Sequence, residues 1–285
     1  MTEFLKMHGL GNDFIVLDAR DNALDLTPEA AQLLADRRFG IGCDQIMILR
    51  PARREGDIFL DMRNQDGSVT GACGNGTRCV AELIMSETGQ EAAVIETQAG
   101  LLHASRHDGL IEVDMGPAQM AWSQIPLASP ADTLHVSLAP DETETAVCVS
   151  MGNPHAVLFV DDVMQVDVAQ RGARLEHHPI FPEAANISFA TIIGEDKIRM
   201  RVFERGVGIT SACGSGACAV AVAAHRRGLT GRIVEVVLDG GSLLISWVDD
   251  GTEEGRVLMR GPAETAFRGT LDGALKDMLL RDASQ

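Results

Sequence analysis

Short hydrophobic runs, each closed by turn residues, recur along most of the chain. The runs at 14–18, 46–49 and 198–203 are rich in Val, Ile, Leu, Met and Phe, and Gly, Asp or Asn lie close to their ends. This pattern is typical of β-strands. Further runs of the same kind occupy residues 94–98, 110–115, 156–159, 233–238 and 243–248. We therefore predict a fold dominated by β-sheet.

Two segments interrupt this pattern with helical character. Residues 77–87 and 217–227 contain Ala and long side chains but few β-branched residues, which favours helix. A cysteine stands shortly before each of them. We predict that each cysteine immediately precedes the start of its helix.

Two further segments also have helical features. Residues 28–38 follow Thr27, a suitable N-cap, and Pro28 occupies the first helical position. Their apolar residues keep helical spacing, so we expect this helix to cover one face of the first half. Residues 271–280 are helix-like as well.

An internal repeat organises the chain. The pentapeptide ACGNG at 72–76 recurs as ACGSG at 212–216, so that Cys73 and Cys213 are 140 residues apart. Glycine-rich turns can resemble one another through composition alone. Three further matches in the same order favour duplication instead, and they pair residues 11–16 with 152–157, 100–102 with 241–244, and 116–118 with 261–263.

The duplication predicts two similar halves, 1–117 and 118–262, with residues 263–285 packing back on the first. A chain of 285 residues with 45% hydrophobic residues is long enough for two cores. We predict an α/β (α+β) fold of two pseudo-symmetric domains, each carrying a sheet, a glycine turn with a cysteine, and a helix.

Charge and cysteine usage restrict the partners and the compartment. A formal net charge of −17 argues against nucleic acid and anionic membranes, which both need a basic surface. The chain has no run of 18 apolar residues and no readable secretory signal. The six cysteines are then expected to be reduced, which indicates the cytoplasm. Their spacing, without C-x-x-C, argues against a zinc site.

Cys73 and Cys213 are the candidate chemical groups. At a helix start, unpaired backbone N–H groups and the positive end of the helix dipole favour a thiolate and bind carboxylates. Gly74, Gly76, Gly214 and Gly216 let the backbone approach a ligand closely, as in an anion nest. Either cysteine alone could simply be a small core residue before a tight turn. The duplicated pair favours catalysis.

Paired thiols suit inversion of a carbon that carries a hydrogen. One thiolate would remove the proton from one face, and the other group, as a thiol, would return a proton to the opposite face. Such an arrangement requires the halves to face each other across a cleft. The alternative is a non-enzymatic thiol protein in which Cys73 and Cys213 form a reversible disulfide.

We expect no cofactor and no metal. No G-x-G-x-x-G follows a strand, and no G-x-x-x-x-G-K-[ST] is present. Pyridoxal chemistry would need a Schiff-base lysine, and Lys6, Lys197 and Lys276 all lack a suitable sequence context.

Taken together, the motifs resemble those of the diaminopimelate epimerase family. Coverage extends from residue 7 to about residue 262. The matching segments are MHGLGNDF (7–14), GIGCDQ (40–45), NQDGS (64–68), CGNGTRC (73–79), GNPH (152–155), NI (186–187), ERGVG (204–208) and ACGSGA (212–217).

The resemblance implies a function and a set of roles. Each domain would be a β-sheet wrapped around a central helix, with the active site in the interdomain cleft. Cys73 and Cys213 would exchange the roles of acid and base in interconverting LL- and meso-diaminopimelate for lysine and peptidoglycan precursors. The helix starts at Gly74–Asn75 and Gly214–Ser215 would hold the reacting carboxylate, and His155 and Glu204 would bias the proton affinities of the thiols.

The polar residues would select the substrate. Asn and Gln amides can pair with ammonium or carboxylate, and one Arg can clamp a carboxylate with two hydrogen bonds. The resemblance assigns the distal end of the substrate to Asn64, Asn153, Asn186 and Arg205, with Asn12 and Gln45 lining the same pocket. Glu204 is also implied to contact the substrate.

Rival interpretations remain at this point. The asparagines could be turn formers, His155 an exposed loop residue, and Glu204–Arg205 a surface ion pair. A proline or hydroxyproline racemase would also use two thiols, but its substrate would leave the distal polar groups unpaired. We expect a small-molecule substrate, no nucleic acid and no membrane, and we keep a homodimer as a hypothesis.

Overall fold

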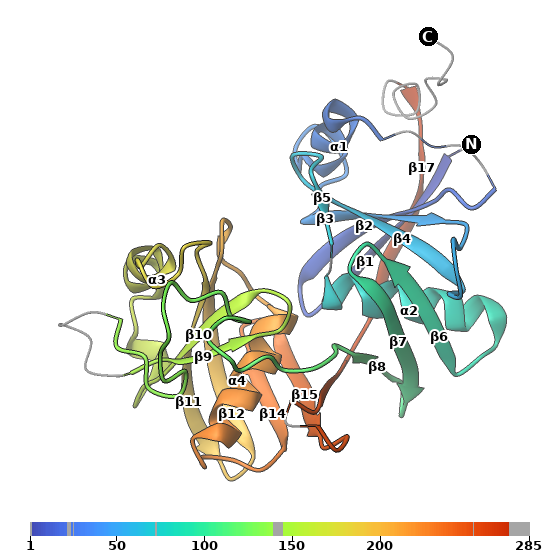
Figure 1. The fold of residues 1–285 in the computed structure, drawn as a ribbon. Coiled ribbons are helices and arrows are strands. Elements are labelled where there is room, and N and C mark those ends of the chain that lie inside the picture. Colours follow the sequence, from blue (N-terminus) through green and yellow to red (C-terminus); the bar gives the residue numbers. More distant parts are fainter. Residues whose placement is uncertain are drawn as a thin grey trace. The chain divides into compact units, whose positions relative to one another are not determined.

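A computed structural model describes residues 2–21, 24, 26–71, 73–138, 145–252 and 254–273. The chain divides into two compact units (Figure 1). Unit 1 comprises Met1–Val113 and Pro262–Gln285, and unit 2 comprises Asp114–Gly261. Within the described ranges, none of the helices is both long and apolar enough to span a bilayer.

Unit 1 contains one mixed sheet. Its strand order is β17-β1-β2-β3-β4-β6-β7-β8, with the short β5 paired to β4, and the β2–β3 and β4–β6 pairs are parallel. The strands are β1 (Thr2–Gly9), β2 (Asn12–Asp18), β3 (Gln45–Arg50), β4 (Ile58–Asn64), β5 (Val69–Thr70), β6 (Ala92–Thr97), β7 (Gly100–His107), β8 (Leu110–Asp114) and β17 (Glu264–Leu271).

Unit 2 repeats this sheet. Its order is β9-β10-β11-β12-β14-β15-β16, with β13 paired to β12, and the β10–β11 and β12–β14 pairs are parallel. The strands are β9 (Val147–Ser150), β10 (Pro154–Phe159), β11 (Asn186–Gly194), β12 (Lys197–Glu204), β13 (Gly208–Ile209), β14 (Ile233–Leu238), β15 (Gly241–Val248) and β16 (Arg256–Gly261).

The helices occupy equivalent places in the two units. A parallel strand pair needs a crossover, and each unit has two. The first crossover carries α1 (Pro28–Ala35) in unit 1 and α3 (Val168–Glu176) in unit 2, and the second carries α2 (Gly74–Thr88) and α4 (Gly214–Arg226). A 3₁₀ helix, η1 (Val163–Gln165), precedes α3. The order and direction of the strands therefore confirm the predicted duplication.

A backbone detail supports the same conclusion. β7 and β15 start at Gly100 and Gly241, whose φ angles are 133° and 138°. Residues other than glycine rarely adopt this region, so both repeats keep glycine at this turn. The predicted match of residues 100–102 with 241–244 reflects this shared geometry.

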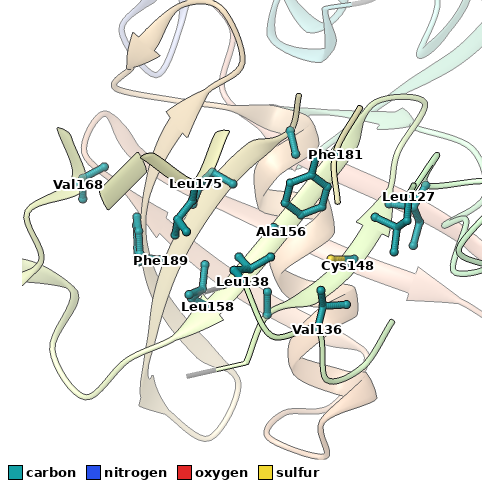
Figure 2. Packing of buried hydrophobic residues seen from close by; sticks show 14 of the residues in the cluster. Leu127, Val136, Leu138, Cys148, Ala156, Leu158, Val168, Leu175, Phe181 and Phe189 are labelled. Carbon is teal, nitrogen blue, oxygen red and sulfur yellow. The ribbon is translucent and has the colours of Figure 1, made fainter. Parts of the chain in front are cut away.

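Each sheet packs on two helices because strand side chains alternate between its faces. In unit 1, Ile15 and Leu17 of β2 belong to the core cluster that contains Leu34 of α1. Figure 2 shows the equivalent cluster of unit 2, with Val168 and Leu175 of α3 near Leu158 and Phe189. The opposite faces cover α2 and α4, which contact several strands of their own sheets. Each half is thus a sheet around a central helix, as predicted.

The helix boundaries differ in detail from those predicted. α2 and α4 each begin three residues earlier, at Gly74 and Gly214, directly after the cysteines. α1 has the expected Thr27 N-cap, whose Oγ1 accepts from the Ala30 N–H at 3.2 Å. It ends at Ala35 because the backbone of Asp36 is extended.

The C-terminal prediction lies partly outside the described residues. Leu271 ends β17, which pairs with β1, so the chain up to this point extends the sheet of unit 1. Residues 274–280 of the predicted helix 271–280 are not described. Sequence patterns also failed to predict α3, because Gly172 and several charged residues obscure its apolar stripe.

Candidate functional site

Cys73 is the N-cap of the central helix of unit 1. Its backbone is extended, with φ −151° and ψ 104°, and its Sγ accepts from the Gly76 N–H at 3.4 Å. The side chain is half-buried. A Cβ at Gly76 would overlap the terminal methyl of Met47 from β3, so a larger residue here would require the Met47 side chain to move. This geometry places the sulfur at the positive end of the helix dipole.

Two asparagines lie next to Cys73. The thiol of Cys73 donates to Asn12 Oδ1 at 3.9 Å, and Asn75 Nδ2 donates to the same oxygen at 3.1 Å. Asn12 begins β2 immediately after the turn from β1, while Asn75 is buried in the first turn of α2. The fold therefore brings Asn12 next to Cys73 and Asn75 at the helix start, whereas the sequence motifs assigned Asn12 to the pocket for the distal end of the substrate.

Gln45 and Asn64 form a second pair in unit 1. They are register partners at the ends of β3 and β4, and Gln45 Nε2 donates to Asn64 Oδ1 at 3.0 Å. Asn64 also anchors the following hairpin, where its Nδ2 donates to Ser68 Oγ at 3.0 Å. The amides are half-buried and retain further hydrogen-bonding capacity.

Cys213 is the equivalent N-cap in unit 2, but its surroundings differ. It is 5% exposed, and its side chain hydrogen-bonds to the Glu204 carboxylate. Burial, followed by the negative charge of Glu204, raises the pKa of Cys213 well above the ordinary value for a thiol. Thr210 Oγ1 donates to Glu204 Oε1 and holds that carboxylate in place.

His155 reaches this site through a chain of hydrogen bonds. Its Nε2 lies 3.0 Å from Asn153 Oδ1, Asn153 Nδ2 donates to Ser215 Oγ at 3.4 Å, and Ser215 Oγ lies 3.7 Å from Cys213 Sγ. Burial, with a smaller contribution from Arg205, lowers the pKa of His155 to about 3. The ring is therefore neutral at physiological pH and is fully buried rather than in an exposed loop.

Asn186 and Arg205 define the turn that carries Glu204. Asn186 Oδ1 accepts from the Arg205 N–H at 3.0 Å, and Asn186 Nδ2 donates to the Pro154 carbonyl at 3.0 Å. The Arg205 guanidinium donates to the Glu183 carbonyl at 3.1 Å. A cavity of about 400 Å³ beside this turn is lined by Glu176, His177, Ala184, Phe203, Arg205, Gly206, Val207 and Gly208.

The other cysteines have a different environment. Burial raises the pKa of Cys43, Cys79 and Cys148 to about 12, so these thiols stay protonated. None of the six cysteines, all of which are described, forms a disulfide. Across the described ranges, no group of three His, Cys, Asp or Glu side chains is arranged to hold a metal ion.

The sequence patterns did not identify two residues that contact Asn12 and Glu204. Asp44 Oδ2 accepts from Asn12 Nδ2 at 2.9 Å, and Thr210 contacts Glu204. Asp44 lies within the motif at 40–45, but its partner is 32 residues away in the sequence. Only the parallel pairing of β2 with β3 brings the two together.

Comparison with known proteins identifies the family of the chain. The family model described as diaminopimelate epimerase matches residues 4–121 and 147–266. A diaminopimelate epimerase from Rhodospirillum centenum is 55% identical over 274 residues, which cover 95% of this chain and 93% of the relative. One from Acidiphilium cryptum is 53% identical, and the match covers 95% and 97% of the two chains.

Solved structures share the fold at low identity. A hydroxyproline epimerase from Agrobacterium vitis superposes with a TM-score of 0.70 at 15% identity, covering 95% of this chain and 90% of that one. A probable proline racemase from Agrobacterium radiobacter gives 0.69 at 17% identity, with coverages of 95% and 93%. The family match spans both halves of the chain, and relatives above 50% identity cover nearly all of it. The chain therefore belongs to the diaminopimelate epimerase family of isomerases.

Proposed function

We propose that the protein interconverts LL- and meso-diaminopimelate by proton transfer between substrate and two cysteines. Cys73 and Cys213 would act on opposite faces of one α-carbon, one as thiolate base and the other as thiol acid. The roles reverse with the direction of the reaction. The domains would correspond to residues 1–117 with 263–285, and 118–262.

One observation carries this proposal: each half of the duplicated fold places a cysteine at the N-cap of its central helix. The first-turn N–H groups have no acceptor within the helix and can bind a carboxylate. Gly74–Asn75 and Gly214–Ser215 supply these groups. The same donors stabilise the negative charge that develops on the carboxylate side of a carbanion.

The environment of Cys213 supports an acid role in the unliganded protein. Its thiol hydrogen-bonds to Glu204, and burial also favours the neutral form. His155 is neutral because burial lowers its pKa. It contacts this site through hydrogen bonds to Asn153 and, from there, to Ser215. We therefore assign to Glu204 and His155 the task of biasing the protonation of the thiol, without direct proton transfer to the substrate.

Amide and guanidinium groups are proposed to select the distal end of the substrate. Asn64, Asn153, Asn186 and Arg205 offer donors and acceptors, with Asn12 and Gln45 completing the set. A proline-like substrate has no second amino-acid end and would leave such groups without partners. The 55% identity to a protein named diaminopimelate epimerase favours the same substrate here.

Deuterium incorporation tests this proposal. The protein is incubated with LL-diaminopimelate in deuterated water, and the product is resolved by chiral chromatography and mass spectrometry. We expect meso product that carries one deuterium at the inverted carbon, and no exchange with proline or hydroxyproline. Absence of exchange from diaminopimelate would reject the proposed activity.

Matched cysteine variants test the mechanism. Cys73→Ser and Cys213→Ser should each abolish epimerisation under reducing conditions, because serine is a far weaker acid. Cys79→Ala on α2 and Cys218→Ala on α4 serve as controls on the same helices and should retain activity. If either serine variant epimerises at the normal rate, two-thiol transfer is wrong and the redox alternative gains support.

We further propose a cytoplasmic location, a role in forming lysine and peptidoglycan precursors, and a homodimer. Reduced thiols are required for proton transfer, which fits a reducing compartment. Sedimentation at several protein concentrations tests the dimer.

A further inference from the structure

Asp44 contacts a residue of the site but has no role in the mechanism described so far. It lies just before β3, where its Oδ2 accepts from Asn12 Nδ2 at 2.9 Å and from the Asp13 N–H at 3.1 Å. Its Oδ1 accepts from Arg37 Nη2 at 2.8 Å. Arg37 also binds Asp13. The Asp13 N–H and the Arg37 guanidinium thus hold the Asp44 carboxylate in a single position.

The chemistry of Asp44 fixes the orientation of the Asn12 amide. A carboxylate only accepts hydrogen bonds, so it must face the NH₂ group of Asn12 and not its oxygen. The Asn12 Oδ1 then points to α2, where it accepts from Asn75 Nδ2 at 3.1 Å and from the Cys73 thiol at 3.9 Å. An amide oxygen can receive a proton-bearing thiol but repels a thiolate.

The second half provides an internal comparison. Asn153 occupies the place of Asn12, since each asparagine follows a glycine of positive φ ahead of the equivalent strand. Phe14 pairs with Gln45 in unit 1, and His155 pairs with Asn186 in unit 2. The residue before Gln45 is Asp44 and the residue before Asn186 is Ala185, so Ala185 is the counterpart of Asp44.

The amide orientation is reversed in this half. Asn153 points its NH₂ group to Ser215, the counterpart of Asn75, and its oxygen to His155. The carboxylate at 44 is thus replaced by a methyl group, and His155 stands where unit 1 has Phe14. Only the first half presents a fixed acceptor to its cysteine through an asparagine.

We propose that Asp44 is a positioning residue that, through Asn12, holds an acceptor against Cys73 and favours its thiol form. This inference rests on the proposed two-thiol function for its catalytic meaning. In that function the two cysteines face different acceptors, the Asn12 amide oxygen at Cys73 and the Glu204 carboxylate at Cys213.

Other charged groups surround the network. Elements β1, β2 and α2 are packed together, and the segment before β3 contributes the remaining residues. The titratable and charged side chains on β1, β2, α2 and residues 36–44, together with the partner of His8, are Glu3, Lys6, His8, Asp13, Asp18, Asp36, Arg37, Arg38, Cys43, Asp44, Arg78, Cys79, Glu82, Glu87 and Glu264. His8 is therefore replaced by Asn in the background used for titration, so that its protonation cannot produce the shift.

Alkylation kinetics test the proposal without requiring substrate. In a Cys213→Ser, His8→Asn background, the rate of Cys73 modification by iodoacetamide is followed against pH by peptide mass spectrometry. Asp44→Asn allows the Asn12 amide to flip, so the pH midpoint of the reaction should fall by roughly half a unit or more. Asp18→Asn, at the other end of β2 and paired with Arg20, should leave the midpoint unchanged.

A double-mutant cycle separates positioning from the loss of a charge. Asn12→Ala removes the acceptor but keeps Asp44, and it should lower the midpoint as Asp44→Asn does. In the Asn12→Ala background, Asp44→Asn should then cause no further shift, because its effect passes through Asn12. Equal shifts in both backgrounds would overturn the proposal, as would an unchanged midpoint in Asp44→Asn.

A double variant that exchanges the side chains at positions 12 and 44 tests the proposal if Asp44→Asn alone does not fold. In Asn12→Asp/Asp44→Asn the amide at 44 donates to the carboxylate at 12, which also accepts from Asn75 and faces Cys73. The midpoint should rise above that of the background protein, and a fall or no change would contradict the role of Asn12. If the original protein alkylates as expected but does not epimerise diaminopimelate, the proposed function fails while this inference stands.

Discussion

The Cys213 thiol donates a hydrogen bond to the Glu204 carboxylate, whereas the Cys73 thiol donates to the amide oxygen of Asn12. The two halves therefore share strand order and a cysteine at the N-cap of the central helix but differ in the group next to the sulfur. Strands β4 and β12 end at Asn64 and Glu204, so a neutral amide stands in one half where a carboxylate stands in the other. This asymmetry leads to the following predictions.

Replacing Glu204 with Gln should make Cys213 more acidic. The carboxylate raises the pKa of Cys213, so removing its charge lowers that pKa and increases the thiolate fraction at neutral pH. Loss of a hydrogen bond to a charged group, worth about 1.5–3 kcal/mol, should reduce kcat/KM for diaminopimelate by about tenfold or more. Iodoacetamide modification of Cys213 against pH, in a Cys73→Ser background, measures the first effect.

Glu195→Gln provides the control for that change. Glu195 is exposed in the turn between β11 and β12, so the substitution removes the same charge without touching Cys213. Its reaction profile should match that of the unsubstituted protein. If Glu204→Gln and Glu195→Gln behave alike, Glu204 does not set the acidity of Cys213.

Burial of neutral His155 should make stability depend on pH. Its pKa is about 3 in the folded protein and 6.5 as the ordinary value, so below pH 6.5 the unfolded chain binds a proton that the folded protein rejects. Stability should fall by about 1.4 kcal/mol per pH unit as the pH decreases from 6.5 toward 3. His155→Gln, which can still donate to Asn153, should lose this part of the dependence.

Urea unfolding at pH 7 and pH 5 measures the difference between the two proteins. Relative to His155→Gln, the unsubstituted chain should lose about 2 kcal/mol between these values. His135→Gln removes an exposed histidine that pairs with Asp132 and should not reproduce the effect. Parallel curves for the unsubstituted chain and His155→Gln would show that His155 is not the titrating group.

Asn186 should matter more for stability than its neighbour Ser188. Asn186→Ala leaves the Arg205 N–H and the Pro154 carbonyl without their partner, at a cost of about 2 kcal/mol in unfolding free energy. Because the Glu204–Arg205 turn loosens, KM for diaminopimelate should rise several-fold more than kcat falls.

Ser188→Ala is the matched control on β11. Ser188 is fully buried, and its Oγ has no hydrogen-bond partner among the described residues, so its removal should be close to neutral. A similar loss of stability in both variants would mean that packing on β11, and not the Asn186 hydrogen bonds, is responsible.

Much of the local structure followed from the sequence. The hydrophobic runs predicted the strands. β14 alternates between buried and more exposed positions because one face packs on the core, whereas β3 is a continuous apolar run that is buried on both faces. The repeated pentapeptide, with its glycines, located both central helices, since glycine permits the close approach at their N-termini. The duplication was visible because the same backbone turns require the same residues.

The sequence by itself thus determined the two cysteines, their place before a helix and the repeat that relates them. Only the tertiary structure decided what stands next to each sulfur. Asp44 reaches Asn12 because β2 and β3 are parallel neighbours, and His155 is buried because the strand alternation turns it away from α3, toward the face that α4 covers. Such contacts depend on strand register and on the facing helix, whereas sequence patterns report only the conformational preference and burial of each segment.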